Sequence, residues 1–521
     1  MTLARPARDL PRTGELTPSQ FAALLSAESS GATKRSVKSE HGQFFTPLPI
    51  ANFMARMFSQ RPSWNLLDPG AGAGVLSCAT IEHSVSSGDA RGGCVTAYEP
   101  DPRILPSLER SLSYAARWAA DRGVPIEYRI IDADFVTESC ETLWTFDMER
   151  RQFDRAICNP PYFKLGANDP RGVLLANVGP WPPNMYALFM MLIAQTLSPD
   201  GEMVTITPRS FASGSYFSAF RKWFFKRVVP TDIHLFESRS SVFEENAVLQ
   251  ESLILKCKPV ESVREEQCVR LSASQSTHDL DGSDTRRLQR TDVLVARHGD
   301  VQLALPVTEG DDSITHVFGT WPGSLEKYGW QVSTGPIVPF RVADQLVEGL
   351  GDPRPNTYPL LWMQSVRRME IVWPWQDLRK PQFVSGDSRQ SRAWLVPDQN
   401  MVLLRRFSPK EDPRRVTAAP LLQGQLGSDL IGLENHVNYI YGRRDPITDA
   451  ECVGLAAFLN SHLVDRYIRI SNGNTQISAR ELRTMPFPPR ELLREVGTSI
   501  LRQESYDADA VVADALKVAA S

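Results

Sequence analysis

Residues 66–76 constrain the fold of this chain more than any other stretch. Two leucines lead into Asp68, and Gly70, Gly72 and Gly74 follow at every second position. This pattern predicts a buried strand that runs into a tight turn and then into a helix, because glycine lacks the Cβ atom that would keep the backbone away from a nucleotide-like ligand. The spacing differs from the dinucleotide fingerprint Gly-x-Gly-x-x-Gly, and an acid precedes it. We therefore expect a ligand that carries a nucleoside and a positively charged amino group.

Two more predicted strands end in acidic residues. Residues 94–98 lead into Glu99, whose carboxylate can accept hydrogen bonds from both hydroxyls of a ribose. Residues 128–131 lead toward Asp134 and Phe135. The Asp134 carboxylate suits an adenine amino group, and the Phe135 ring can pack on the face of that base. Because open α/β sheets bind ligands at the carboxyl ends of their strands, the three strand ends together predict a nucleoside-bearing cofactor.

The sequence Asn159-Pro160-Pro161-Tyr162 is the strongest candidate for the chemistry. It follows an apolar run at residues 153–158 that is typical of a short buried strand. Proline supplies no backbone donor and disfavours helix in the residue before it, so the strand ends here with Asn159 extended. The Asn159 side-chain oxygen and a proline carbonyl can receive both hydrogens of an exocyclic amino group, and the Tyr162 ring can stack on the base that carries it. A strand-ending Asn-Pro turn is the plainer alternative.

A predicted helix precedes the glycine-rich stretch. Thr46 and Pro47 stand before apolar residues at helical spacing, so we expect Thr46 to cap this helix and Pro47 to lie in its first turn. The free N–H groups of such a helix start can hold a carboxylate. Downstream, we expect a helix over residues 217–229 and a strand over residues 248–256. These elements complete the β-α alternation of a doubly wound sheet.

Composition excludes several classes of protein. A chain of 521 residues is expected to form two or three domains. Its seven cysteines include no Cys-x-x-Cys pair, which argues against a disulfide framework or a zinc site, and its eight histidines are scattered, so we expect no metal. The longest apolar run is too short to cross a bilayer and the N-terminus lacks the apolar core of a secretion signal, so we expect a cytoplasmic protein that does not contact a membrane.

Any nucleic-acid contact must come from a local patch, because the formal net charge of the chain is -4. Between residues 361 and 410, nine basic residues stand against four acidic ones. The basic residues are Arg367, Arg368, Arg379, Lys380, Arg389, Arg392, Arg405, Arg406 and Lys410. Aromatic residues are interleaved with these basic side chains. The basic side chains could contact phosphates, with Arg405 and Arg406 as candidates. A solvated face of the protein would have the same composition.

Taken in order, these motifs resemble the S-adenosylmethionine-dependent DNA adenine-N6 methyltransferases. Gln43-Phe44-Phe45-Thr46-Pro47 ahead of the glycine-rich stretch is similar to the gamma arrangement typified by the TaqI enzyme. From about residue 40 to about residue 490, the chain most resembles the PstI/BsuBI type of modification methylase. Three more stretches support this resemblance, at residues 236–243, 332–335 (Val-Ser-Thr-Gly) and 474–477 (Asn-Thr-Gln-Ile). Ala71 stands where many relatives have cysteine, and residues 36–41 have no equivalent, but neither departure removes a required chemical group.

The resemblance implies an α/β fold: a Rossmann-like class I methyltransferase sheet with helices on both faces, followed by a C-terminal α+β target-recognition domain. With the composition, it implies a helical arm at residues 1–40, a catalytic domain at residues 41–260, a connection at residues 261–320 and the target-recognition domain at residues 321–521. The implied activity is methyl transfer from S-adenosylmethionine to the N6 amino group of a flipped-out adenine in double-stranded DNA. A cognate restriction endonuclease would be a further partner.

The resemblance also implies a role for each site residue. Those that would bind the cofactor are Asp68, Gly70, Gly72 and Glu99 at its methionine and ribose parts, Asp134 and Phe135 at its adenine, and Thr46 near its carboxylate. Those that would meet the target base are Asn159 and Pro160 at the amino group, Pro161 in the same motif, and Tyr162 and Phe243 on opposite faces of the ring.

Other functions remain open from the sequence. Methylases of protein glutamine amides share the Asn-Pro-Pro-Tyr motif, and an RNA adenine methyltransferase could use the same site. The glutamine enzymes lack a long basic region after the sheet, which argues against that reading. A specificity or scaffold protein would keep the fold without the activity, but the intact motifs at residues 68–74 and 159–162 argue against it.

Overall fold

The N-terminal half is built on strands whose neighbouring residues face opposite apolar cores. Leu66 and Leu67 are consecutive on β1 (Ser63–Pro69), yet they belong to different core clusters. On β4 (Phe153–Cys158), Ile157 packs with Leu66 while Cys158 packs with Leu67. A strand buried on both faces needs a layer of helices on each side, so these short apolar runs already require a three-layer arrangement.

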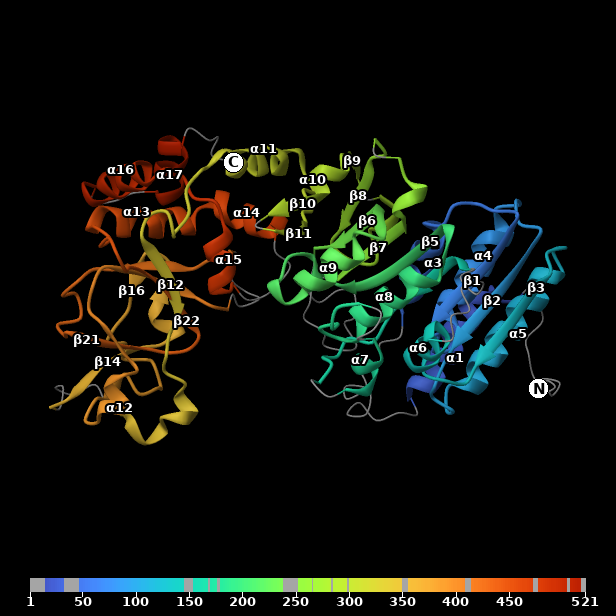
Figure 1. Cartoon of the computed structure of the whole chain (residues 1–521), viewed down its shortest axis with the longest axis horizontal. Helices are drawn as coiled ribbons and strands as arrows, with labels where there is room; N and C mark the ends of the chain where they lie inside the picture. Colours follow the sequence, from blue (N-terminus) through green and yellow to red (C-terminus); the bar gives the residue numbers. More distant parts are fainter. Residues whose placement is uncertain are drawn as a thin grey trace. The chain divides into compact units, whose positions relative to one another are not determined.

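The computed structural model describes residues 15–31, 46–144, 153–166, 169–175, 179–237, 252–264, 266–282, 284–297, 299–348, 355–407, 414–471, 477–503 and 507–516. The chain divides into two units, Met1–Val307 and Thr308–Ser521. Figure 1 follows the elements of each along the chain from blue to red. Within the described residues, no helix is both long and apolar enough to cross a bilayer.

A nine-stranded sheet forms the centre of the first unit, in the order β3-β2-β1-β4-β5-β7-β6-β8-β9. The five strands from β3 to β5 are parallel, and β7 is antiparallel to both of its neighbours. Besides β1 and β4, these strands are β2 (Gly92–Tyr98), β3 (Ile126–Ile131), β5 (Leu197–Pro208), β6 (Val228–Phe236), β7 (Ser252–Pro259), β8 (Val269–Ser274) and β9 (Thr285–Leu288). The carboxyl ends of the parallel strands therefore meet at one edge of the sheet.

Helices cover both faces of this sheet (Figure 1), and the predicted fold class is confirmed. The helices that pack in the core with Leu66 are α1 (Pro18–Gly31), α3 (Leu48–Arg56), α4 (Val75–Ser86) and α5 (Leu105–Ala120). Those that pack in the core with Leu67 are α6 (Phe135–Trp144), α8 (Met185–Thr196) and α9 (Ser218–Phe224), with the short α7 (Pro170–Leu175) against it.

One predicted helix is shorter than the sequence pattern suggested. The helix expected over residues 217–229 is wrong in its second half, because α9 ends at Phe224 and the buried strand β6 begins at Val228. Val228, Val229 and Pro230 account for the change, since β-branched residues favour strands and proline cannot continue a helix. Strand β7 overlaps the strand expected over residues 248–256, of which residues 248–251 lie outside the described part.

The segment expected as a connection, residues 261–320, is folded over most of its described length. Strands β8 and β9 extend the main sheet. A separate hairpin follows, formed by β10 (Leu294–Arg297) and β11 (Asp300–Leu303). Helix α11 (Glu309–Thr320) then begins the second unit with a capping box between Thr308 and Asp311.

The second unit combines small sheets with a group of helices. One sheet has the order β12-β22-β19-β20, and another has the order β13-β17-β14-β21-β18. These strands are β12 (Trp330–Thr334), β13 (Leu346–Val347), β14 (Thr357–Leu361), β17 (Phe383–Ser385), β18 (Leu395–Pro397), β19 (Met401–Arg405), β20 (Ala418–Leu421), β21 (Leu430–Leu433) and β22 (Val437–Gly442), and β15 (Val366–Arg367) pairs with β16 (Glu370–Ile371). The helices are α11, α12 (Arg389–Arg392), α13 (Asp449–Asn460), α14 (His462–Ser471), α15 (Ala479–Thr484), α16 (Arg490–Leu501) and α17 (Ala508–Leu516).

Helices α13 and α16 cross at two glycines. A Cβ atom built on Gly454 would lie 1.8 Å from the carbonyl oxygen of Leu493, and one built on Gly497 would lie 1.7 Å from that of Ala450. Neither distance is compatible with a side chain, so the two backbones approach as closely as they do only because both positions are glycine. This crossing packs beside the apolar core of the second unit, to which Leu493 belongs.

We expect Gly454→Ala to lower the free energy of unfolding of the second unit by about 1–3 kcal/mol, because the added methyl group must push α16 away from α13. Thermal unfolding followed by circular dichroism measures the effect. Gly319→Ala in α11 is the matched control, since a Cβ atom there meets nothing within 4 Å. Equal melting temperatures for the two variants would contradict the close crossing.

Candidate active site

The turn after β1 is held by backbone hydrogen bonds that require glycine. The amide nitrogens of Gly70 and Ala71 both donate to the carbonyl oxygen of Tyr98, at 2.9 and 2.8 Å. Gly70, Gly72 and Gly74 have φ angles of 77°, 57° and 84°, which side chains rarely tolerate. Gly74 is also the residue that caps the start of α4. The turn therefore joins the ends of β1 and β2 and begins the helix, as the sequence predicted.

Asp68 is a buried acid with an unsatisfied oxygen. Its side chain is 0% exposed, and its Oδ2 accepts a 2.6 Å hydrogen bond from the hydroxyl of Ser77 on α4. Its Oδ1 has no hydrogen-bond partner in the described part of the chain. Burial raises the pKa of Asp68 to about 7, although the Ser77 hydrogen bond opposes this and nearby Glu99 adds to it. A ligand with a cationic or donor group would satisfy this carboxylate.

Glu99 lies beside the same turn and is also buried. Its Oε2 accepts from the amide nitrogen of Gly72 at 2.9 Å, and its Oε1 accepts from that of Asp101 at 2.9 Å. Burial raises the pKa of Glu99, while these two backbone hydrogen bonds oppose the rise. Each oxygen keeps a further lone pair, so the carboxylate is fixed in place and can still accept from the two hydroxyls of a ribose.

Asp134 and Phe135 stand at the start of α6. The Oδ1 of Asp134 accepts from the amide nitrogen of Thr137 at 3.0 Å, which caps the helix. The Phe135 ring is buried and contacts Tyr98 edge-on, with centroids 5.2 Å apart, and Phe189 at 5.3 Å. Both residues thus have structural partners, and their contact with an adenine ring remains a prediction.

Asn159 lies at the carboxyl end of β4, next to the end of β1. The thiol of Cys158 donates to the carbonyl oxygen of Pro69 at 3.2 Å and ties the two strand ends together. Asn159 Nδ2 donates to the hydroxyl oxygen of Thr46 at 3.1 Å. The hydroxyl of Tyr162 donates to Asn159 Oδ1 at 2.7 Å. The structure thus brings Thr46 to Asn159 and Tyr162, although the sequence places it more than a hundred positions before them.

The Tyr162 ring is packed among apolar side chains. It contacts Tyr186 edge-on, with centroids 6.2 Å apart and planes at 90°, and its hydroxyl also lies 3.1 Å from the carbonyl oxygen of Ile206. Burial raises the pKa of Tyr162 well above its usual value, so the phenol remains a neutral hydrogen-bond donor. Pro160 is buried and Pro161 is half-buried beside it. The predicted stacking of Tyr162 on a base stays a prediction.

Sequence reasoning about Thr46 was wrong in one respect. Helix α3 begins at Leu48 with Pro47 as its N-cap, and no side chain of the described residues caps it. The hydroxyl of Thr46 instead reaches Asn159. Sequence reasoning also missed Ser77, whose hydroxyl fixes Asp68; the available signal was a polar residue in the otherwise apolar first turn of α4.

Several predicted site residues lie outside the described residues. They are Phe243, proposed for the second face of the base, residues 43–45 before Thr46, and residues 474–476 of the C-terminal motif. Among the residues that are described, no three His, Cys, Asp or Glu side chains gather as a metal-binding group.

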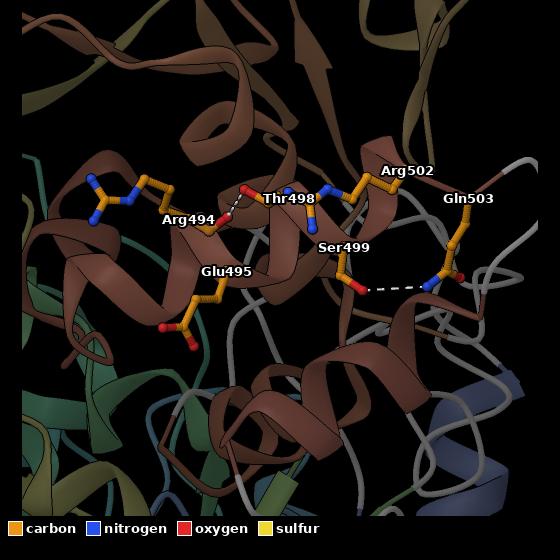
Figure 2. Close-up of a pocket in the computed structure, with 6 residues that line it drawn as sticks. All are labelled: Arg494, Glu495, Thr498, Ser499, Arg502 and Gln503. Carbon is orange, nitrogen blue, oxygen red and sulfur yellow. Dashed lines mark hydrogen bonds between the residues drawn. The ribbon is translucent and has the colours of Figure 1, made fainter.

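A depression lies on α16 and just after it, in the second unit. It is lined by Arg494, Glu495, Thr498, Ser499, Arg502 and Gln503 (Figure 2). Its polar groups bond to one another: Thr498 donates to the Arg494 carbonyl at 2.8 Å, and Gln503 donates to the Ser499 hydroxyl at 3.3 Å. None of the predicted site residues lines it.

If the pKa of Asp68 is raised as burial requires, its ionisation opposes folding of the protein without a ligand. The stabilising contribution is complete below the ordinary value of 3.8 and is lost as the pH rises through about 7. We expect wild type to lose roughly 1–4 kcal/mol of unfolding free energy relative to Asp68→Asn between pH 4 and pH 8. Urea unfolding across this range measures the difference, with Asp121→Asn as an exposed control. A difference that stays constant with pH would contradict it.

Two relatives of known class match most of this chain, including residues of both units. The family described as Eco57I restriction-modification methylase matches residues 119–243. The type II methyltransferase M.PstI of Providencia stuartii is 32% identical over 466 residues, covering 89% of this chain and 90% of that protein. M.BsuBI of Bacillus subtilis is 32% identical over 471 residues, covering 89% and 91%. A tRNA1(Val) (adenine(37)-N6)-methyltransferase of Shewanella sediminis is 25% identical over 226 residues, covering 43% of this chain and 81% of that protein.

Proposed function

This chain belongs to the type II methyltransferases of restriction-modification systems, together with M.PstI and M.BsuBI, and we propose that it methylates the N6 amino group of an adenine flipped out of double-stranded DNA. As a member of this family it is an S-adenosylmethionine-dependent DNA methyltransferase, and the predicted family and enzyme class are confirmed. The adenine, its N6 atom and the residues that hold it are the proposed part. A cognate endonuclease is also part of the proposal.

The observation that carries the proposal is the position of Asn159-Pro160 at the end of β4, beside the glycine-rich turn. The amide oxygen of Asn159 and the backbone carbonyl of Pro160 are adjacent acceptors, which match the two hydrogens of an exocyclic amino group. The adenine amino nitrogen is a poor nucleophile because its lone pair is delocalised into the ring. Two acceptors can favour tetrahedral geometry and aim the lone pair at an electrophilic methyl group.

No strong base is needed at this site. The amino proton becomes acidic only after the nitrogen has gained the methyl group, so a neutral amide can serve in place of a carboxylate. The name of the tRNA relative, whose match spans 43% of this chain, also supports adenine N6 as the acceptor. DNA is favoured over RNA because the two type II relatives match nearly 90% of the chain, including the second unit.

The residues at the carboxyl edge fit the cofactor of this family. S-adenosylmethionine supplies an electrophilic sulfonium methyl group when it is bound. The unsatisfied Oδ1 of Asp68 suits its amino group, and the fixed carboxylate of Glu99 suits the ribose. Gly70 and Gly72 leave room for its approach, and Asp134 with Phe135 would meet its adenine. Aromatic rings near the site would favour a cationic sulfonium.

We expect Asn159→Ala to abolish methyl transfer while the affinity for S-adenosylmethionine is retained, because the amide would contact the base and not the cofactor. Transfer of a tritiated methyl group to DNA, followed by base analysis, measures activity, and isothermal titration calorimetry measures cofactor affinity against wild type. Loss of both together would remove Asn159 from the target side. A label on cytosine in the wild-type reaction would overturn the proposed acceptor.

We propose that the second unit reads the DNA sequence, and its exposed basic residues support this role. Arg367 lies over the ring of Trp375, with its guanidinium carbon 4.8 Å from the centroid, and the Lys380 ammonium lies 4.3 Å from the ring of Trp362. Such pairs hold a cation in place at the surface. In contrast, Arg405 and Arg406 are half-buried. Arg405 donates to the carbonyl oxygen of Val366, and Arg406 donates to that of Asn435. Arg367 and Lys380 are therefore better candidates for phosphate contacts.

We expect Arg367→Ala and Lys380→Ala each to weaken binding to all duplexes and to lower the slope of log K against log salt concentration by about one. Fluorescence anisotropy with a labelled duplex at several salt concentrations measures both quantities. Arg494→Ala on α16 controls for loss of one positive charge elsewhere in the unit. A slope equal to that of wild type would mean that these side chains do not contact phosphates.

A further inference from the structure

The amide of Asn159 is held at both ends by side chains from distant parts of the chain. Its Nδ2 donates to Thr46 Oγ1 at 3.1 Å, and its Oδ1 accepts from the Tyr162 hydroxyl at 2.7 Å. The first contact joins residues 113 positions apart, across the start of α3 and the end of β4. Helix α3 has no side-chain cap among the described residues, so the Thr46 hydroxyl is not used as a helix cap.

The orientation of this amide decides whether the site presents an acceptor or a donor to the target amino group. Rotation about the Cβ–Cγ bond by a half turn would exchange Oδ1 and Nδ2, which differ little in shape. With Nδ2 toward the target, the site would present a donor to an amino group that also donates, and one of the two proposed acceptors would be lost. A group that fixes Nδ2 on the far side therefore fixes the acceptor.

We propose that Thr46 is a positioning residue for Asn159: its hydroxyl oxygen accepts from Nδ2 and thereby keeps Oδ1 toward the target amino group. This rests on the proposed function. The resemblance places Thr46 near the cofactor carboxylate, and the two roles are compatible. If that carboxylate lies within reach, the Thr46 hydroxyl would donate to it, because a carboxylate can only accept, and the Thr46 oxygen would still accept from Asn159. A bound cofactor would then reinforce the orientation of the amide that the Thr46 contact already sets.

Both roles require a hydroxyl at position 46. Valine has nearly the same shape as threonine but can neither accept from Nδ2 nor donate to a carboxylate. Serine keeps both functions. If Thr46 served the cofactor alone, its loss would raise the dissociation constant for S-adenosylmethionine and leave turnover at saturation unchanged. If it also orients Asn159, turnover must fall even when the cofactor site is full.

The kinetic test compares Thr46→Val and Thr46→Ser with wild type at saturating S-adenosylmethionine, using the full chain and a duplex that wild type methylates. We expect kcat to fall roughly tenfold or more in Thr46→Val, the size of effect that one lost orienting hydrogen bond gives, and to return to near wild type in Thr46→Ser. Thr80→Val is the control, because its buried hydroxyl donates to the Leu76 carbonyl of its own helix and to no other group among the described residues. Thermal unfolding checks that every variant folds.

A binding measurement separates orientation from general damage to the site. Two duplexes differ only at the target position, where one has adenine and the other has purine without the amino group. Wild type should bind the adenine duplex more tightly, because only adenine offers hydrogens to Oδ1. In Thr46→Val this preference should shrink severalfold, whereas a merely distorted site would weaken both duplexes equally. The measurement needs no methyl transfer.

The outcomes distinguish the two proposals. Wild type that methylates adenine N6, with unchanged kcat at saturation and unchanged preference for adenine in Thr46→Val, would overturn the positioning role alone. Wild type that does not methylate adenine N6 would overturn the proposed function itself. A fall in kcat that Thr46→Ser does not restore would also count against the positioning role, because serine retains the hydroxyl.

Discussion

The structure of the site depends on one turn, in which the carbonyl oxygen of Tyr98 accepts from two successive amide nitrogens at the end of β1. These hydrogen bonds need left-handed backbone angles that glycine adopts easily. The same turn places the amide nitrogen of Gly72 where it donates to the Glu99 carboxylate. It also starts α4, which carries Ser77 to Asp68. Backbone geometry in a few residues therefore fixes two acids at the edge where the parallel strands end.

Burial alone does not determine how an acid behaves in this protein. Burial raises the pKa of Glu202, but Lys256, Lys258 and Ser59 surround it and together hold its pKa at about 2. Asp68 is equally buried, yet it has one hydroxyl partner and an unsatisfied oxygen, and its pKa is raised to about 7. The hydrogen-bonding capacity and charge of Glu202 are thus matched by groups of the protein itself. Asp68 Oδ1 instead remains available to a donor group of a ligand, and its burial lowers the stability of the protein without a ligand.

Sequence reasoning succeeded where the signal was local. The strand, the glycine turn and the Asn159-Pro160 strand end each depend on a few consecutive residues, so their types alone predicted them. The helix start at Thr46 was wrong, because the partner of its hydroxyl, Asn159, directly follows β4 and no local pattern predicts a contact across 113 positions. Strands β8 and β9 extend the sheet although the composition around them resembles a connection, since pairing of β8 with β6 and burial of Leu271 decide the outcome.

The two C-terminal motifs of the resemblance are linked to each other inside the second unit. Thr334 donates to Oδ1 of the buried Asn438, whose Nδ2 donates to the carbonyl oxygen of Ile477, so the two motifs meet through one side chain. Gly335 is required because a Cβ atom there would lie 2.2 Å from the carbonyl oxygen of Glu434. These described contacts hold the unit together. If this unit reads DNA as proposed, the base contacts would come from exposed side chains, because these buried groups are already used within the unit.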